Sequence, residues 1–514
     1  MTKPHWSHLD VATLDFSDSK TWDMICSGQT SGVFQIESAG MTETCRRVQP
    51  RCMEDLIAIL ALYRPDTMSE LEHFIRRKNG EEPIEYWHPL LEKILNKTYG
   101  CWIYQEQIMQ ATKIFGGYSD AEADKFRKGI GKKDKALVRK LAEELRDRII
   151  LNGFDEDFAN KLADFFAEKG GYMFNKGHST GYAILTFKTA FLKANHDVFY
   201  MASLISNQKK ESGQTNYQKV GFYVYQSKLM EIAVKNPDIN TSSEWFKPFP
   251  NNGSPYIVYG MNLVKGVGKN AVETIKKLRP FNSFEDFLER AHPEGTINKT
   301  VTIALIKSGA FDFTGKQREN LLKAYRDFRF SSGTDDIKPI KNINKTHIEK
   351  MIDANIVRGQ EVYNKELCLT RWNKWRKLQH EEYWEENVMY GDIFTWEFET
   401  ISYHLVGNPF EGIEFQEWET IEDEEEKAVI GGVIIKIGKT KVKRGRSAGA
   451  EMAFLSVETQ DGIREVTVFN ENWERFRDKL TKGAMMVIRG KKQGEQLLLG
   501  GCMSLDEYKQ HNNL

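Results

Sequence analysis

Several features are scarce in this 514-residue sequence, and each scarcity excludes a class of protein. Proline occurs only 13 times, which argues against long disordered linkers. No stretch approaches the ~18 consecutive apolar residues of a membrane span, and the opening MTKPHWSHLD lacks the apolar core of a secretion signal. We therefore expect folded domains that work in the cytoplasm, without a membrane contact.

Paired cysteines and excess charge are also absent. The six cysteines are scattered, with no C-x-x-C pair and no Cys/His cluster at zinc spacing, so we predict free thiols and no metal site. Lys and Arg number 72 against 73 Asp and Glu, which leaves a net charge of −1. Any nucleic-acid binding must then depend on local basic patches rather than on an overall positive field.

Hydrophobic periodicity predicts a mostly α, multidomain fold. Residues 1–210 are predicted to form a helical domain, with apolar residues at helical spacing from about residue 20 in stretches that include 53–64, 104–117, 135–153 and 156–171. Asp155 precedes the last of these, and we interpret it as a helix N-cap rather than a catalytic carboxylate. Residues 211–330 combine a connector, which includes a strand at 256–260, with a second helical unit.

The last two segments differ from the first two. Residues 331–427 are predicted to form an irregular connecting region, rich in tryptophan and ending in acidic residues, with the tryptophans buried. From 428 to 514 the apolar period becomes two, and five short strands are broken by a helical stretch at 471–480. This pattern predicts an OB-type β-barrel.

The strongest motif is NLVKGVGKNAVETIKK, residues 262–277. Gly266 and Gly268 precede a lysine-rich helix, so backbone N–H groups can meet a phosphate between Lys265 and Lys269. With a second helix expected at 296–312, this is the helix-hairpin-helix way of gripping a DNA backbone. A tight turn without a ligand is the alternative.

Two further motifs combine cations with glycine or aromatic residues. In KFRKGIGKKDKALVRK, residues 125–140, a glycine-rich bend between cations suits a triphosphate or a nucleic-acid strand, although a solvated basic loop is equally compatible. In residues 170–193, Lys176, His178 and Tyr182 interleave as a phosphate-binding and base-stacking surface would. An ordinary helix surface is the alternative there.

The predicted barrel has an excess of basic residues, although the whole chain is nearly neutral. Residues 430–505 hold 14 Lys and Arg against 8 Asp and Glu. This excess favours single-strand binding in an electrostatic groove, with Phe454, Phe469 and Trp473 as candidate stacking rings. Because aromatic residues in small barrels are commonly core, the stacking assignment competes with a purely structural one.

Five motifs follow one another along residues 30–183: TSGVFQIESAGM (30–41), AILALYRPDTM (58–68), TYGCWIYQEQIMQ (98–110), FRKGIGKKD (126–134) and GYMFNKGHSTGYA (171–183). Their order and approximate spacing resemble those in the fingers of the alpha subunit of bacterial DNA polymerase III, the C-family replicative polymerase. The similarity continues through the hairpin segment and the barrel. It implies fingers that cradle an incoming nucleotide, a helix-hairpin-helix on duplex DNA, and an OB domain near the single-stranded template.

The resemblance also implies site residues. Those expected at the nucleotide are Ser31, Gly32, Gln35, Tyr63, Arg64, Gln105, Gln107, Arg127, Lys132, Lys133, Asn175, Lys176 and His178. Those expected at DNA, from the motifs and the resemblance together, are Lys265, Gly266, Gly268, Lys269, Lys439, Lys441, Lys443 and Arg444. Cations and donors at these places can neutralise triphosphate charge during phosphoryl transfer.

The resemblance begins just after the family's palm domain, whose carboxylates bind two Mg²⁺. Asp10, Asp15, Asp18 and Asp23 are not in D-x-D order. We therefore expect no catalytic residue here and no polymerisation by this chain alone.

The leading hypothesis is the C-terminal half of a split polymerase. In this hypothesis a palm-bearing partner chain and the dNTP hold Mg²⁺, and this chain does not. The other expected partners are primer-template DNA and a sliding clamp. A non-catalytic, DNA-binding replication accessory protein is the alternative, and an independent nuclease is a third.

Overall fold

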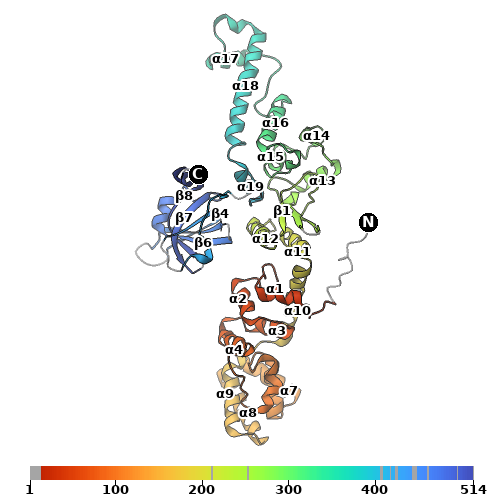
Figure 1. The fold of residues 1–514 in the computed structure, drawn as a ribbon, viewed down its shortest axis with the longest axis vertical. Coiled ribbons are helices and arrows are strands. Elements are labelled where there is room, and N and C mark those ends of the chain that lie inside the picture. Colours follow the sequence, from red (N-terminus) through yellow and green to blue (C-terminus); the bar gives the residue numbers. More distant parts are fainter. Residues whose placement is uncertain are drawn as a thin grey trace. The chain divides into compact units, whose positions relative to one another are not determined.

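The computed structural model describes residues 13–132, 134–209, 212–251, 254–405, 409–416, 418–422, 427–442, 448–459, 462–494 and 496–512. The chain divides into two compact units, Met1–Tyr200 and Met201–Leu514, each of which is described by itself (Figure 1). No helix in the described residues has the length and apolar character needed to cross a membrane.

The first unit is helical. Its helices are α1 (Ser19–Ser27), α2 (Ala39–Val48), α3 (Met53–Leu62), α4 (Met68–Lys78), α5 (Glu92–Leu95), α6 (Gln105–Gly116), α7 (Asp120–Ile130), α8 (Lys135–Leu151), α9 (Glu156–Lys169) and α10 (Lys176–Asn195). The helix α11 (Asp197–Ser206) spans the boundary between the units. The four long helical stretches predicted from periodicity are confirmed as α3, α6, α8 and α9.

Two hydrophobic cores hold this unit together. One gathers apolar side chains of α1 to α4 around α10, and α3 is apolar on nearly all sides because it lies at the centre of that core. The other joins α5 to α9. Side-chain caps set several helix starts: Asp155 accepts a hydrogen bond from the Phe158 N–H at 2.9 Å, which confirms its predicted N-cap role.

The second unit begins with α12 (Tyr217–Leu229) and a small sheet. Its strands β1 (Ala233–Lys235), β3 (Tyr256–Val258) and β2 (Lys247–Phe249) lie in the order β1-β3-β2, with β1 parallel and β2 antiparallel to β3. Four helices follow: α13 (Lys269–Leu278), α14 (Phe284–Arg290), α15 (Lys299–Lys307) and α16 (Arg318–Ser331). The second helix expected at 296–312 is α15, but α14, which the sequence prediction missed, precedes it.

The prediction of an irregular region at 331–427 is wrong. Its described part is largely helical, with α17 (Lys345–Asp353), the 23-residue α18 (Lys365–Asn387) and α19 (Ile393–Ile401). The apolar residues of α18 have no helical period, but its many Glu, Lys, Arg and Leu residues have high helix propensity. The predicted burial of the tryptophans is confirmed for Trp372, Trp384, Trp396 and Trp418, which are at most 5% exposed.

A closed five-stranded barrel follows, as predicted. The strands β4 (Ala428–Lys441), β5 (Glu451–Thr459), β6 (Gly462–Val468), β7 (Met485–Gln493) and β8 (Gln496–Ser504) pair in the order β4-β5-β6-β8-β7. The β6–β8 pair is parallel, and α20 (Asn470–Phe476) lies between the third and fourth strands. This is the Greek-key arrangement of an OB fold. The helix α21 (Leu505–Asn512) ends the described chain.

Candidate nucleotide and nucleic-acid interface

Three predicted nucleotide-binding residues meet around Phe174, just before α10. The backbone N–H of Gln105 donates to the Phe174 carbonyl at 2.9 Å, which joins the start of α6 to the segment before α10. The Arg127 guanidinium donates to Gln105 Oε1 at 2.9 Å, and the Arg64 guanidinium lies 4.8 Å from the Phe174 ring centroid while donating to the Tyr172 carbonyl. Two cations and an amide thus form one cluster. The sequence prediction missed Phe174, its centre.

The first turn of α10 carries three further predicted residues. Asn175 is the N-cap and accepts from the His178 N–H at 2.8 Å. The Glu106 carboxylate accepts from the Lys176 N–H at 3.0 Å, and Lys176 Nζ lies 3.0 Å from Glu54 Oε2. A triphosphate that binds here would have to displace Glu54 from the Lys176 ammonium.

A row of rings follows the exposed face of α10. The His178 ring centroid lies 4.5 Å from that of Tyr182, and Tyr182 lies 5.4 Å from Phe34. Both Phe34 and Tyr182 are 37% exposed. Rings at these separations and with open faces can stack on a base. Phe34 was not predicted, although it stands between predicted residues of the same motif.

A buried lysine fixes the loop that carries Ser31 and Gly32. Lys193, only 1% exposed, donates from Nζ to the carbonyls of Gln29 and Ser31, each at 2.8 Å. Burial lowers the pKa of Lys193 to about 8. The Tyr200 hydroxyl donates to the Gly32 carbonyl at 2.6 Å. In sequence, a lysine near a helix end gives no sign of this role.

Gln35 and Tyr63 take different positions near this cluster. Gln35 is exposed and has a left-handed backbone, with φ of 65°. Tyr63 is half-buried, and its hydroxyl lies where a Cβ on Gly40 would stand, so it packs against α2. Among the residues that the structure describes, neither forms a hydrogen bond with Arg64, Arg127 or Lys176.

The prediction for Gln107 is not supported by its surroundings. The side chain is 5% exposed; its Oε1 accepts from the N–H groups of Ile103 and Tyr104, and its Nε2 donates to Thr98 Oγ1, all at 2.8 Å. Every polar atom is therefore used to hold the chain at the start of α6. Gln107 is a structural residue here.

The cations after α7 lie at the rim of a groove. Lys132 is exposed, and with Lys135 and Arg139 it lines a groove of about 870 Å³ between α8 and α9. The floor includes Val138 and Ala163. Lys133 lies outside the described residues.

The carboxylates near this cluster do not form a metal site. Glu54 pairs with Lys176, Glu106 accepts the N–H of Lys176, and Asp124 pairs with Arg127 and Lys128. Among the described residues, no group of three His, Cys, Asp or Glu is placed to hold a metal ion. Because Glu54, Glu106 and Asp124 are engaged by Lys176, Arg127 and Lys128, they do not fit a two-Mg²⁺ centre.

The hairpin motif of the second unit presents an open helix N-terminus. Gly266 has φ of 90°, and a Cβ there would lie 3.2 Å from Thr300 Cγ2 of α15, so glycine is required. Gly268 is the N-cap of α13 and provides no side-chain acceptor, while Gly268 and Lys269 are exposed. The first N–H groups of α13 are thus open to an anion.

Lys265 departs from the predicted phosphate-facing position. Its Nζ donates to the Glu399 carbonyl at 2.9 Å, at the C-terminal end of α19, and its pKa falls to about 8 mainly because it is buried. An ammonium is favourable at the negative end of a helix dipole. Lys265 therefore stabilises the contact between the hairpin and α19.

The barrel has one exposed ring beside a lysine. Phe454 on β5 is 41% exposed and pairs with Gly438 on β4, whose lack of a side chain leaves the ring open. Lys436, two residues from Gly438 along β4, is exposed on the same side. Phe469 is also exposed, at 47%.

The other barrel predictions have mixed outcomes. Lys439 and Lys441 are exposed, as a contact with DNA would require, and Lys439 Nζ lies 4.9 Å from the Trp473 ring centroid. Trp473 is 2% exposed, so its suggested stacking role is wrong. It belongs to the barrel core because the helix α20 covers the barrel between the third and fourth strands. Lys443 and Arg444 lie outside the described residues.

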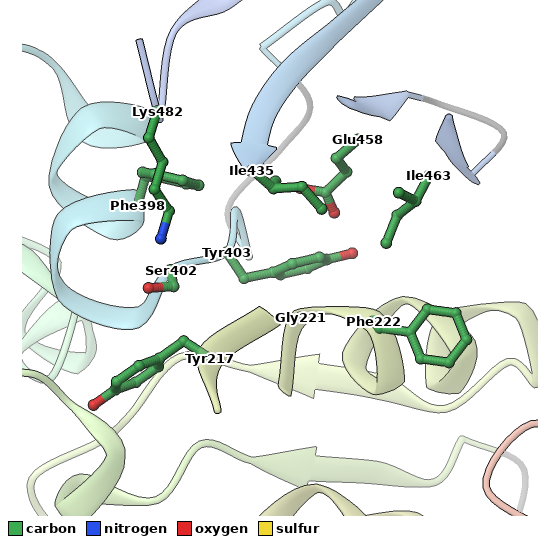
Figure 2. A pocket seen from close by; sticks show the side chains of 10 residues that line it. All are labelled: Tyr217, Gly221, Phe222, Phe398, Ser402, Tyr403, Ile435, Glu458, Ile463 and Lys482. Atoms are coloured by element: carbon green, nitrogen blue, oxygen red, sulfur yellow. The ribbon is translucent and has the colours of Figure 1, made fainter. Parts of the chain in front are cut away.

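A small cavity lies between α12, the end of α19 and the barrel (Figure 2). Its volume of about 20 Å³ is enough for one water molecule, which excludes a nucleotide. Glu458 of β5 points toward Tyr403 and is hydrogen-bonded to it, and burial raises the pKa of Glu458 to about 7. The residues around this cavity therefore hold the helices against the barrel and do not form a ligand site.

Comparison with known proteins identifies the same parts of the chain. The model of the bacterial DNA polymerase III alpha subunit finger domain matches residues 1–153, and that of a helix-hairpin-helix motif matches residues 231–321. These matches cover the Phe174 cluster only in part, because it also uses residues after 153. They include the whole hairpin from β1 to the start of α16.

Several curated relatives are alpha subunits of DNA polymerase III. The DNA polymerase III subunit alpha of Campylobacter jejuni is 40% identical over 60% of this chain and 26% of its own length. Those of Aquifex aeolicus and Bacillus subtilis are each 30% identical, over 95% and 97% of this chain and 38% and 42% of their own lengths. The chain therefore spans less than half the length of these relatives.

Proposed function

Because this chain is similar, over nearly its whole length, to a C-terminal portion of bacterial DNA polymerase III alpha subunits, we propose that it takes part in DNA-templated DNA synthesis. The observation that carries the proposal is this similarity, which runs through the finger domain and the hairpin. The chain then works in the cytoplasm with the rest of the replication machinery.

In this proposal the first unit binds the incoming dNTP. Arg64, Arg127 and Lys176 are the cations near Phe174, and they offset triphosphate charge. The row His178, Tyr182 and Phe34 offers a face to a base. Lys193 keeps the loop of Ser31 and Gly32 in place beside α10.

The second unit holds DNA. The open N-terminus of α13 with Lys269 binds duplex phosphates, and the barrel face with Phe454 and Lys436 binds single-stranded template. The catalytic carboxylates and Mg²⁺ belong to a palm on another polypeptide segment, and a sliding clamp is a further partner.

The test is primer extension. The chain is mixed with a palm-bearing polypeptide from the same genome, primed template, dNTPs and Mg²⁺. Extension by the mixture, with none by either polypeptide alone, is the expected result. If the folded mixture does not extend the primer although this chain binds primer-template, the non-catalytic accessory role is the correct one.

A further inference from the structure

A small basic lobe lies outside every site described above. Residues 336–377, the tip lobe, contain α17, a 3-10 turn at Gly359–Tyr363 and the first half of α18. Figure 1 shows α17 beside the N-terminal end of α18. Neither the hairpin motif nor the barrel includes these residues.

The tip lobe has a fixed shape. Its own core contains Met351, Val357, Cys368 and Trp372, each at most 5% exposed. The side chain of Asn373 on α18 both accepts from the Ile340 N–H and donates to the Ile340 carbonyl, at 2.8 and 3.0 Å. The segment before α17 is thereby held against α18, so the charges of the lobe have defined positions.

The charge of the tip lobe is strongly positive. It holds ten Lys and Arg residues against five Asp and Glu residues, whereas the whole chain has a net charge of −1. Five of its lysines are exposed and have no carboxylate within ion-pair distance among the described residues: Lys338, Lys341, Lys350, Lys365 and Lys374. These charges are available to an external anion.

Helix stability does not account for this distribution. Lys365, Arg371 and Lys374 lie in the N-terminal half of α18, whereas Glu381 and Glu385 lie in its C-terminal half. The helix dipole acts mainly on the first and last turns, where Lys365 stands beside Glu366 and no base ends the helix. The dipole therefore gives no reason for the excess of cations in the N-terminal half of α18.

We propose that the tip lobe binds the phosphate backbone of double-stranded DNA, at a site separate from the hairpin. The inference rests on the proposed function, since it assumes that the chain handles DNA. The lysines are spread over the segment before α17, α17 itself and the first half of α18, which suits an extended polyanion rather than a small ligand.

The aromatic residues favour duplex over single-stranded DNA. Trp372 is in the lobe's core and Trp375 is half-buried, which leaves only Tyr363, 86% exposed, as an open ring among the lobe's described residues. Single-strand binding uses several such rings as stacking platforms. Contacts between lysines and phosphates need none and carry no sequence preference.

The test is a salt titration of duplex binding by the full chain. The tip variant combines Lys338→Gln, Lys341→Gln and Lys374→Gln. The control combines Lys20→Gln, Lys93→Gln and Lys219→Gln, three exposed lysines elsewhere that give the same change in net charge. Binding of a labelled random-sequence duplex is measured over a range of NaCl concentrations, and a third variant carries Lys269→Gln in the hairpin.

The tip variant is expected to flatten the slope of log K against log salt by roughly 0.9 for each lost phosphate contact, and the control to leave it unchanged. An unchanged slope in the tip variant, with a flatter slope for Lys269→Gln, overturns this inference and leaves the proposed function in place. Absence of any duplex binding by the native chain overturns both. A lysine-dependent affinity for polyglutamate but not for duplex would assign the lobe to an acidic protein instead.

Discussion

The Arg127 guanidinium donates a hydrogen bond to the side-chain oxygen of Gln105 at 2.9 Å, across 22 residues of sequence. Gln105 in turn holds the Met173 and Phe174 carbonyls through its side-chain and backbone N–H groups. One cation of α7 is thus tied to the segment that enters α10. The proposed nucleotide site depends on this connection.

Replacing Arg127 by alanine removes both a charge and this connection. If the cluster binds a triphosphate, loss of a charge-assisted contact raises the KM for dNTP roughly ten- to hundredfold in reconstituted primer extension. The matched control is Lys128→Ala, because Lys128 pairs with the same Asp124 but is far more exposed. Equal effects of the two substitutions would contradict the assignment of Arg127.

Lys193 offers a test of the loop that carries Ser31 and Gly32. Lys193→Met leaves the Gln29 and Ser31 carbonyls without their buried donor, at a cost of about 1–3 kcal/mol. Hydrogen exchange of the 28–37 segment should then become faster, while Lys188→Met on the same helix should leave it unchanged. If hydrogen exchange of the 28–37 segment in the Lys193→Met chain stays as slow as in the native chain, the loop does not depend on this lysine.

The hairpin glycines should respond differently to alanine. Gly266 has φ of 90° and a Cβ would crowd Thr300, so Gly266→Ala should destabilise the second unit by about 1–3 kcal/mol and weaken duplex binding. Gly268 has φ of −88° and open space around a Cβ, so Gly268→Ala should be nearly neutral for stability. Thermal unfolding of both variants measures the difference; equal losses would contradict this account of Gly266.

Glu458 should make the second unit less stable as the pH rises. Burial raises its pKa from 4.5 to about 7, so between these values the folded state keeps a proton that the unfolded state has lost. The stabilisation is complete below pH 4.5 and is lost as the pH rises through 7, by at most about 3 kcal/mol.

The substitution Glu458→Gln should remove this pH dependence, as measured by thermal unfolding at pH 5 and pH 8. Glu471→Gln, at an exposed position of α20, is the control and should keep it. If the Glu458→Gln chain keeps the pH dependence of stability that the native chain shows, another group titrates in this range.

Sequence patterns predicted the elements whose burial is one-sided. The apolar period of 3.6 predicted α8 and α9, and alternation predicted the barrel strands. The helix α18 was missed because its apolar residues follow no period. It forms through propensity and local ion pairs such as Lys377–Glu381 at 3.8 Å.

The site was predictable by segment but not by side chain. Gln105 and Gln107 belong to one motif, yet two residues along a helix lie on nearly opposite sides, so one faces Arg127 and the other is buried. Lys265 was expected to contact a phosphate. Its ammonium instead donates a hydrogen bond to a carbonyl of α19, more than a hundred residues later in the chain. Only the tertiary structure shows such contacts.

The central claim, that this chain handles DNA through phosphate contacts on its second unit, is tested most directly by primer-template binding over a range of salt concentrations. The account predicts that log K falls linearly with log salt, by about 0.9 for each phosphate contacted, and equally for unrelated DNA sequences. Binding that does not change with salt, or no binding at low salt, would contradict it.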